Sequence, residues 1–122
     1  MSRFKSLSPY VALAAIGISF SILMVLTSGP ARVYCAKPFA QRDHHVVMFS
    51  TGWCPYCRQA RVLFEENDIK YCEYDVESSE ENNHIMSDLG GVGVPLFMVG
   101  DKVLHGFDEY ELKRELYSQN YM

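Results

Sequence analysis

The chain has 122 residues and a formal net charge of -4, which is enough for one globular domain and no more. Residues 1–42 carry five bases and no acid, hence +5, whereas residues 43–122 carry six bases and 15 acids, hence -9. An acidic domain lacks the basic surface that nucleic-acid binding requires, so we expect no nucleic-acid partner. An apolar content of 48% excludes a disordered chain, and four cysteines are too few for a miniprotein built on disulfides.

An uncharged apolar run occupies Val11–Leu26, after the bases Arg3 and Lys5. A basic start followed by such a run is typical of an export signal or a signal anchor. The apolar stretch at residues 10–28 approaches the roughly 20 residues that span a bilayer. The pattern therefore predicts one N-terminal hydrophobic helix that contacts a membrane.

Three segments follow from this pattern. We expect residues 1–30 to be a retained signal anchor or a cleaved signal peptide, whose best cleavage site is Gly29-Pro30-Ala31. An organelle transit peptide and a buried core helix are the alternatives. Residues 31–43 then form a polar linker. The domain at residues 44–122 is expected to be membrane-anchored or exported, on the non-cytoplasmic side.

The rest of the chain alternates strand and helix patterns. We expect strands at His45–Ser50, Lys70–Val76, Pro95–Val99 and Lys102–His105, and helices at Pro55–Asn67, from Ser78 to about Leu89, and at Asp108–Gln119. Ser78 and Glu81 form a capping box, and Gly100-Asp101 suits a hairpin turn. A helical crossover makes the first two strands parallel, and a hairpin makes the last two antiparallel. The order β-α-β-α-β-β-α predicts an α/β domain with a four-stranded mixed sheet.

Two cysteines separated by two residues, Cys54 and Cys57, lie where the first strand passes into the first helix. This spacing in a βαβ context predicts a redox dithiol. Cys54 falls at the helix N-cap, where free amides and the helix dipole favour its thiolate and lower its pKa from the ordinary value of about 8.5. An acidic thiol is above all a good leaving group. We therefore expect Cys54 to attack a disulfide, and Cys57 or an external thiol to resolve the mixed disulfide.

The residues beside the two cysteines have expected roles of their own. Trp53 and Tyr56 offer apolar contact to a peptide or to glutathione. Pro55 suits the first helical position, where no amide donor is needed. Arg58 and Arg61 add positive charge on the same helix, and Arg61 is assigned to its polar side together with Glu65 and Glu66.

The stretch VVMFSTGWCPYCRQARVLFEENDIKYCEYDV resembles the glutaredoxin family, whose most typical dithiol sequence is CPYC. The resemblance covers about residues 45–119 and implies a thioredoxin fold. It also implies a thiol-disulfide oxidoreductase that acts on disulfide-containing or glutathionylated proteins. Glutathione is the implied co-substrate, with no tightly bound cofactor and no metal.

The resemblance assigns further site residues. Val94-Pro95 matches the cis-proline element beside the active cysteine, although a cis bond is rare for X-Pro in general. His105-Gly106-Phe107-Asp108 takes the place of the segment that holds the glutamyl end of glutathione. Thr51 stands where the family carries a lysine that holds a glutathione carboxylate.

Alternatives to the glutathione-dependent enzyme stay open. Gly106-Phe107 also resembles the NrdH and mycoredoxin proteins, which implies a glutathione-independent electron carrier supplied by a thioredoxin-type reductase. An iron–sulfur cluster carrier, with Cys54 ligating a cluster at a dimer interface, is a second alternative. A non-catalytic adaptor with the same fold is a third.

The other cysteines and histidines carry weaker signals. Cys72 falls on the strand face of Tyr74 and is expected to be a buried, inert thiol. Cys35 is expected to be a free exposed thiol, a dimer link or part of a removed segment. A structural zinc site usually takes four ligands, which these positions do not offer together. His105, near the dithiol, either packs at a strand end or tunes the Cys54 pKa.

Overall fold

The computed structural model describes residues 8–27 and 29–122. Its elements are α1 (Pro9–Thr27), the 3₁₀ turn η1 (Phe39–Gln41), β1 (Val46–Ser50), α2 (Pro55–Glu66), β2 (Tyr71–Asp75), α3 (Glu80–Asp88), β3 (Leu96–Val99), β4 (Lys102–His105) and α4 (Glu109–Ser118). From β1 onward, each element exists as the sequence predicts, with bounds within two residues of those expected.

The four strands form one mixed sheet in the order β2-β1-β3-β4. β1 pairs in parallel with β2 and antiparallel with β3, and β3 pairs antiparallel with β4. The parallel crossover and the closing hairpin are therefore confirmed. β1 is central in the sheet and is buried along its whole length, which explains its continuous apolar sequence.

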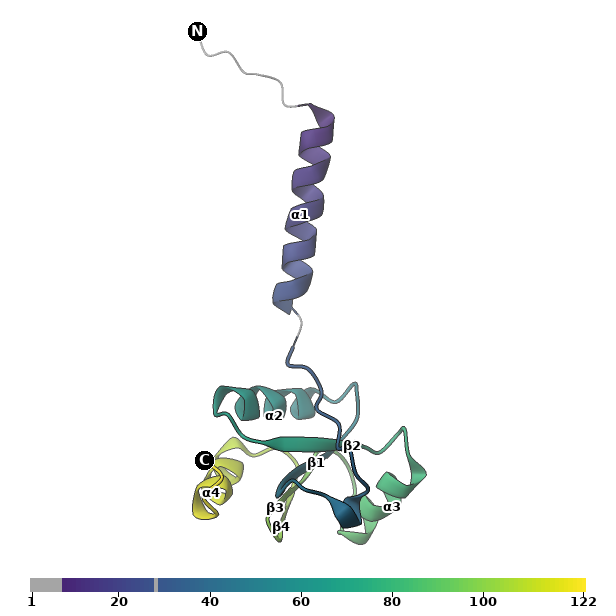
Figure 1. Ribbon diagram of the computed structural model, residues 1–122, viewed down its shortest axis with the longest axis vertical. Helices are drawn as coiled ribbons and strands as arrows, with labels where there is room; N and C mark the ends of the chain where they lie inside the picture. Colours follow the sequence, from purple (N-terminus) through teal and green to yellow (C-terminus); the bar gives the residue numbers. More distant parts are fainter. Residues whose placement is uncertain (1–7, 28) are drawn as a thin grey trace.

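Helices cover both faces of the sheet (Figure 1). One face packs against α2 and α4, which contribute Leu63, Phe64, Leu112 and Leu116 to the core. The other face packs against α3 and η1, where Phe39 lies against Phe49 and Tyr74. Strand residues alternate between these two clusters because successive side chains point to opposite faces. The arrangement is a thioredoxin-like fold.

The first end of α3 is set by a side-chain cap, and the last by the backbone conformation of a glycine. The Ser79 hydroxyl caps the helix by accepting from the Asn82 amide at 3.2 Å, so the predicted cap at Ser78 is wrong. The cap lies one residue later because the Asp75 carboxylate accepts from the Ser78 amide at 3.1 Å. At the other end Gly90, with φ of +84°, adopts the left-handed conformation that terminates a helix.

α4 is amphipathic, but its aromatic residues are not part of the core. Leu112 and Leu116 are buried, whereas Tyr110 is 75% exposed and Tyr117 is exposed as well. Leucines four residues apart already cover the sheet, and the two tyrosines flank this stripe.

α1 stands apart from the sheet domain (Figure 1). Its described apolar side chains, such as Leu13 and Ile16, are exposed, so it is not the buried core helix considered above. Among the residues that the structure describes, no helix meets the length and hydropathy needed to cross a membrane. Arg3 and Lys5 lie outside the described residues. Removal or retention of residues 1–30 stays a prediction.

Residues 32–35, called the edge segment below, lie along the outer edge of β2. Tyr34 forms a parallel bridge with Glu73. The Cys35 amide donates to the Glu73 carbonyl at 3.0 Å, and the Glu73 amide donates to the Val33 carbonyl at 2.7 Å. This part of the predicted linker therefore contacts the sheet.

A disulfide joins Cys35 to Cys72, with their Cα atoms 4.9 Å apart. The expectations of a free Cys35 and of an inert Cys72 thiol are therefore wrong. Burial of Cys72 is confirmed, at 2% exposure. The two cysteines are 37 residues apart, and only the pairing of the edge segment with β2 brings them together.

Candidate active site

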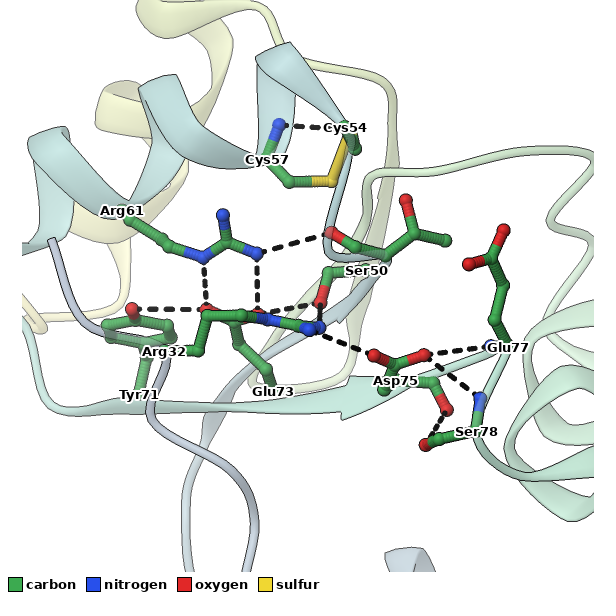
Figure 2. Close-up of polar contacts among 11 residues, drawn as sticks. Arg32, Ser50, Cys54, Cys57, Arg61, Tyr71, Glu73, Asp75, Glu77 and Ser78 are labelled. Atoms are coloured by element: carbon green, nitrogen blue, oxygen red, sulfur yellow. Dashed lines mark hydrogen bonds and ion pairs between the residues drawn. A yellow bond between two sulfur atoms is a disulfide. The ribbon is translucent and has the colours of Figure 1, made fainter. Parts of the chain in front are cut away.

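Cys54 and Cys57 lie at the start of α2 and form a disulfide, with Cα atoms 5.2 Å apart (Figure 2). Cys54 is the N-cap, with extended φ and ψ of -68° and 114°, and Pro55 opens the helix. The Cys57 amide donates to the Cys54 sulfur at 3.1 Å. The predicted helix-start position of Cys54 is confirmed, and a first-turn amide points at its sulfur as thiolate stabilisation requires.

The two cysteines differ in access to solvent. Cys54 is 3% exposed and Cys57 is 0% exposed, and both belong to the core cluster shared by α2 and α4. Cys54 keeps a small exposed surface, and Cys57 has none. Of the two residues, only Cys54 therefore offers any surface to an incoming group.

Exposed aromatic rings stand on both sides of Cys54. Trp53 and Tyr56 are 68% and 58% exposed. The Trp53 indole N–H donates to Glu77 Oε1 at 2.7 Å, which ties the ring to the loop after β2. Pro55 and Arg58 are exposed on the first turn of α2, and the Arg58 amide donates to the Cys54 carbonyl at 3.2 Å.

The predicted cis peptide is present between Val94 and Pro95. Pro95 is fully buried at the start of β3, and its carbonyl accepts from the Gly106 amide at 2.9 Å. Val94 and Phe107 are half-buried and pack against the core cluster that contains both active cysteines. The structure thus joins the proline loop to the segment after β4, and both contact the core cluster to which the active cysteines belong.

Asp108 and His105 lie at the two ends of this second segment. Asp108 is exposed and caps α4, with its carboxylate accepting from the Glu111 amide at 2.9 Å. His105 is the exposed last residue of β4. Contact of Asp108 with a ligand, and an effect of His105 on Cys54, stay predictions.

Thr51 is 2% exposed and lies in the loop between β1 and the dithiol. Its carbonyl accepts from Arg61 Nη2 at 3.4 Å. Its hydroxyl is buried, and among the described residues it has no hydrogen-bond partner. Thr51 therefore belongs to the interior of the domain beneath the site.

A buried charge cluster lies behind the dithiol (Figure 2). Arg61 Nε and Nη2 donate to the two Glu73 carboxylate oxygens at 2.6 and 2.9 Å. The Ser50 hydroxyl donates to Glu73 Oε2 at 2.6 Å, and the Tyr71 hydroxyl donates to Oε1 at 3.3 Å. Arg32, from the edge segment, approaches Glu73 Oε2 at 3.3 Å.

The assignment of Arg61 to the polar side of its helix is wrong, since the residue is 4% exposed. The spacing of apolar residues in α2 indicates that Arg61 is buried. Cys57, Ala60 and Phe64 are buried at the spacing of one helical face, and Arg61 falls within that stripe. Glu73 likewise stands in a strand whose neighbours are buried on both sides.

The cluster sets the ionisation of its members. Burial alone would raise the pKa of Glu73, but hydrogen bonds from Arg61, Ser50 and Arg32 outweigh it and hold the pKa below its ordinary value. The pKa of Asp75 is also lowered, because two backbone amides and Arg32 offset its burial. Burial and the Glu73 carboxylate raise the pKa of the Tyr71 hydroxyl. Both carboxylates are therefore ionised at neutral pH.

The part of the chain that the structure describes contains no group of three or more His, Cys, Asp or Glu side chains suited to a metal ion. Four cysteines form two disulfides, one at the active site and one at the edge of β2.

Comparisons with known proteins agree with this geometry. The family model for glutaredoxin matches residues 46–104. Glutaredoxin-C8 of Oryza sativa subsp. japonica is 34% identical over 105 residues, which cover 81% of this chain and 72% of the relative. Glutaredoxin-C4 of Arabidopsis thaliana is 28% identical over 113 residues, which cover 89% of this chain and 82% of the relative.

Solved structures share the fold. A glutaredoxin from Archaeoglobus fulgidus superposes with a TM-score of 0.57 at 21% identity, over 66% of this chain and 95% of the other. A buckwheat glutaredoxin in complex with glutathione gives a TM-score of 0.53 at 20% identity, over 65% of this chain and 82% of the other. With its dithiol at a helix start and a curated relative matched over most of both lengths, the chain belongs to the glutaredoxin family of thiol oxidoreductases.

Proposed function

We propose that the chain reduces protein disulfides or glutathione mixed disulfides, with Cys54 as the attacking sulfur and Cys57 as the resolving sulfur. The supporting observation is the difference between the two cysteines. Cys54 caps α2, accepts a bond from the Cys57 amide and keeps a small exposed surface, whereas Cys57 has none. A thiolate at a helix N-cap both attacks and leaves readily.

The reaction balances as two exchanges. The Cys54 thiolate attacks one sulfur of the substrate disulfide, and the other substrate sulfur leaves as a thiolate and takes up a proton. Cys57, deprotonated as it reacts, then attacks the Cys54 sulfur of the mixed disulfide and releases the second substrate thiol. The enzyme is left with the Cys54–Cys57 disulfide seen in the structure. Two thiols of an external reductant return it to the dithiol and become a disulfide themselves.

Glutathione is the reductant and mixed-disulfide partner that we propose. Contacts of residues that the resemblance assigns to its binding support this: Val94 and Phe107 pack against the core cluster that contains the active cysteines, and the Gly106 amide donates to the Pro95 carbonyl. Asp108 lies next to them at the exposed start of α4. The similar buckwheat protein was solved with glutathione.

Two cysteine variants test the proposal. Turnover of a glutathionylated peptide should be lost in Cys54→Ser and retained in Cys57→Ser, because external glutathione can resolve a mixed disulfide without Cys57. Reduction of a protein disulfide through the closed Cys54–Cys57 state should be lost in both. Full turnover by Cys54→Ser would exclude the proposed chemistry. Turnover with a thioredoxin-type reductase but not with glutathione would favour the glutathione-independent carrier instead.

We also propose that the domain works in an oxidising compartment, exported or anchored through residues 10–28. The Cys35–Cys72 disulfide supports this, since such bonds persist where thiols are not kept reduced. Trapping thiols by alkylation in intact cells tests it. Cys35 and Cys72 should stay unlabelled, and labelling of both would place the domain in a reducing compartment.

A further inference from the structure

Arg32 joins the edge segment to the loop that carries the dithiol. Its Nη2 donates to the Ser50 hydroxyl at 3.1 Å, and its Nη1 pairs with Asp75 Oδ2 at 2.9 Å. A Cβ atom added to Gly52 would lie 3.4 Å from Arg32 Nη1. The guanidinium therefore lies along residues 50–52, which lead directly into Cys54 (Figure 2).

Three kinds of contact hold Arg32 in this place. Its own side chain is bonded to Ser50, Glu73 and Asp75. The backbone of the edge segment makes two hydrogen bonds to Glu73. The Cys35–Cys72 disulfide, three residues after Arg32, is the one covalent link between this segment and β2. Since the link closes 37 residues of chain, its loss frees the segment to leave the sheet edge.

We propose that Arg32 is a positioning residue of the dithiol site, and that the Cys35–Cys72 disulfide holds it against the active-site loop. The inference rests on the proposed function and extends it. Arg32 fixes the end of β1 through Ser50 and supplies the second positive charge of the buried cluster. The edge segment therefore contributes to the redox properties of the dithiol site.

The charges around the dithiol decide whether removal of Arg32 favours the Cys54–Cys57 disulfide or the reduced dithiol. Glu73 and Asp75 on β2 are balanced by Arg61 of α2 and by Arg32. The other titratable residues that contact this set are Tyr71 at Glu73, Tyr34 at Arg32, and Glu77, whose amide donates to Asp75. Removing Arg32 leaves two carboxylates with one buried cation, so the surroundings of Cys54 become more negative. A thiolate at Cys54 is then less favoured, and the oxidised Cys54–Cys57 pair gains relative to the dithiol.

The test measures the equilibrium of each cysteine pair of the full chain with dithiothreitol, by alkylation and peptide mapping near neutral pH. Arg32→Gln should shift the Cys54–Cys57 equilibrium toward the disulfide by about threefold or more. Arg32→Lys keeps the charge and should stay close to the parent protein. Arg32 is only partly buried, so these variants are expected to fold, and circular dichroism verifies this.

The disulfide is tested by Cys35→Ala with Cys72→Ala. This pair of changes should give the same shift as Arg32→Gln. Combining all three substitutions should add little, because each change removes the same contact between Arg32 and the active-site loop. An unchanged equilibrium in Arg32→Gln would overturn the proposal, even if the variant melts at lower temperature. Full additivity would overturn the part assigned to the disulfide. A parent chain that exchanges with dithiothreitol but reduces no substrate disulfide would instead contradict the proposed function.

Discussion

Arg61 Nε lies 2.6 Å from Glu73 Oε1, and the two side chains, 4% exposed and 1% exposed as residues, form a buried ion pair between α2 and β2. The pair connects the helix that carries Cys57 to the strand beside β1. Arg61 also donates to the Thr51 carbonyl. The helix, the strand and the loop before the dithiol therefore meet at one guanidinium.

Removing one partner of this pair should destabilise the domain severely. Glu73→Gln leaves the Arg61 charge buried with weaker acceptors, and we expect a loss of about 3–5 kcal/mol in unfolding free energy. Urea denaturation at pH 7 measures it. Arg61→Met added to Glu73→Gln serves as the control and should recover part of the loss, since it removes the uncompensated charge. A Glu73→Gln variant within 1 kcal/mol of the parent, roughly the value of a surface pair, would contradict this expectation.

Acid should destabilise the folded domain through the same carboxylates. The pKa values of Glu73 and Asp75 are lowered on folding, so the unfolded chain binds protons more readily. Their contribution to stability is complete above the unfolded values of about 4.3 and 3.9 and is lost as pH falls through the lower folded values. Urea midpoints from pH 7 to 2.5 should fall steeply below about pH 4. In Glu73→Gln that fall should be shallower, and parallel curves would exclude Glu73 as its source.

An alkylating reagent should modify only one sulfur of the reduced dithiol. Because Cys54 is the N-cap and keeps a small exposed surface whereas Cys57 has none, iodoacetamide should modify Cys54 well below pH 7 and leave Cys57 unmodified. Peptide mapping of the reduced, briefly alkylated protein measures both sites. Equal labelling of the two cysteines would remove the basis for their different roles.

The Cys35–Cys72 disulfide should matter more for stability than the active-site disulfide. Loop-closure entropy for its separation of 37 residues corresponds to about 4 kcal/mol, whereas a separation of three residues gives about half as much. Chemical denaturation should therefore show a larger loss for Cys35→Ala with Cys72→Ala than for Cys54→Ala with Cys57→Ala. The opposite ranking would argue against a bond that ties the edge segment to β2.

Adjacent hydroxyls should respond in opposite ways to removal. The buried Thr51 hydroxyl has no partner among the described residues, so Thr51→Val should raise the unfolding free energy by about 1 kcal/mol. Ser50→Ala is the matched control. It removes bonds to Glu73 and Arg32 and should cost about 1–3 kcal/mol. A loss of stability in Thr51→Val would show that its hydroxyl is satisfied in solution.

Local patterns were sufficient for the elements and for the dithiol. The apolar run of β1, the hairpin turn at Gly100-Asp101 and the N-cap position of Cys54 each depend on a few neighbouring residues, and the structure has all three. The cis bond before Pro95 followed only from the family resemblance, because nothing local to Val94-Pro95 demands it.

Long-range pairings could not be predicted in the same way. Arg61 and Glu73 appear polar in isolation, and burial becomes favourable only when each meets the other across the crossover. Cys35 and Cys72 are likewise brought together by the pairing of the edge segment with β2, which the periodicity of the sequence does not predict. The misplaced cap at Ser78 has a more local cause, since the Asp75 carboxylate takes the Ser78 amide that a capping box would give to Glu81.

The edge segment also protects the sheet from other chains. An outer strand offers unpaired N–H and C=O groups on which another polypeptide can add, and this is a common start of aggregation. Here the outward-facing backbone groups of Glu73 are already occupied by Val33 and Cys35. The opposite edge, β4, carries the exposed charged and polar side chains of Lys102 and His105 instead. A chain that loses its Cys35–Cys72 bond should therefore be the more prone to associate through β2, independently of any change at its active sulfurs.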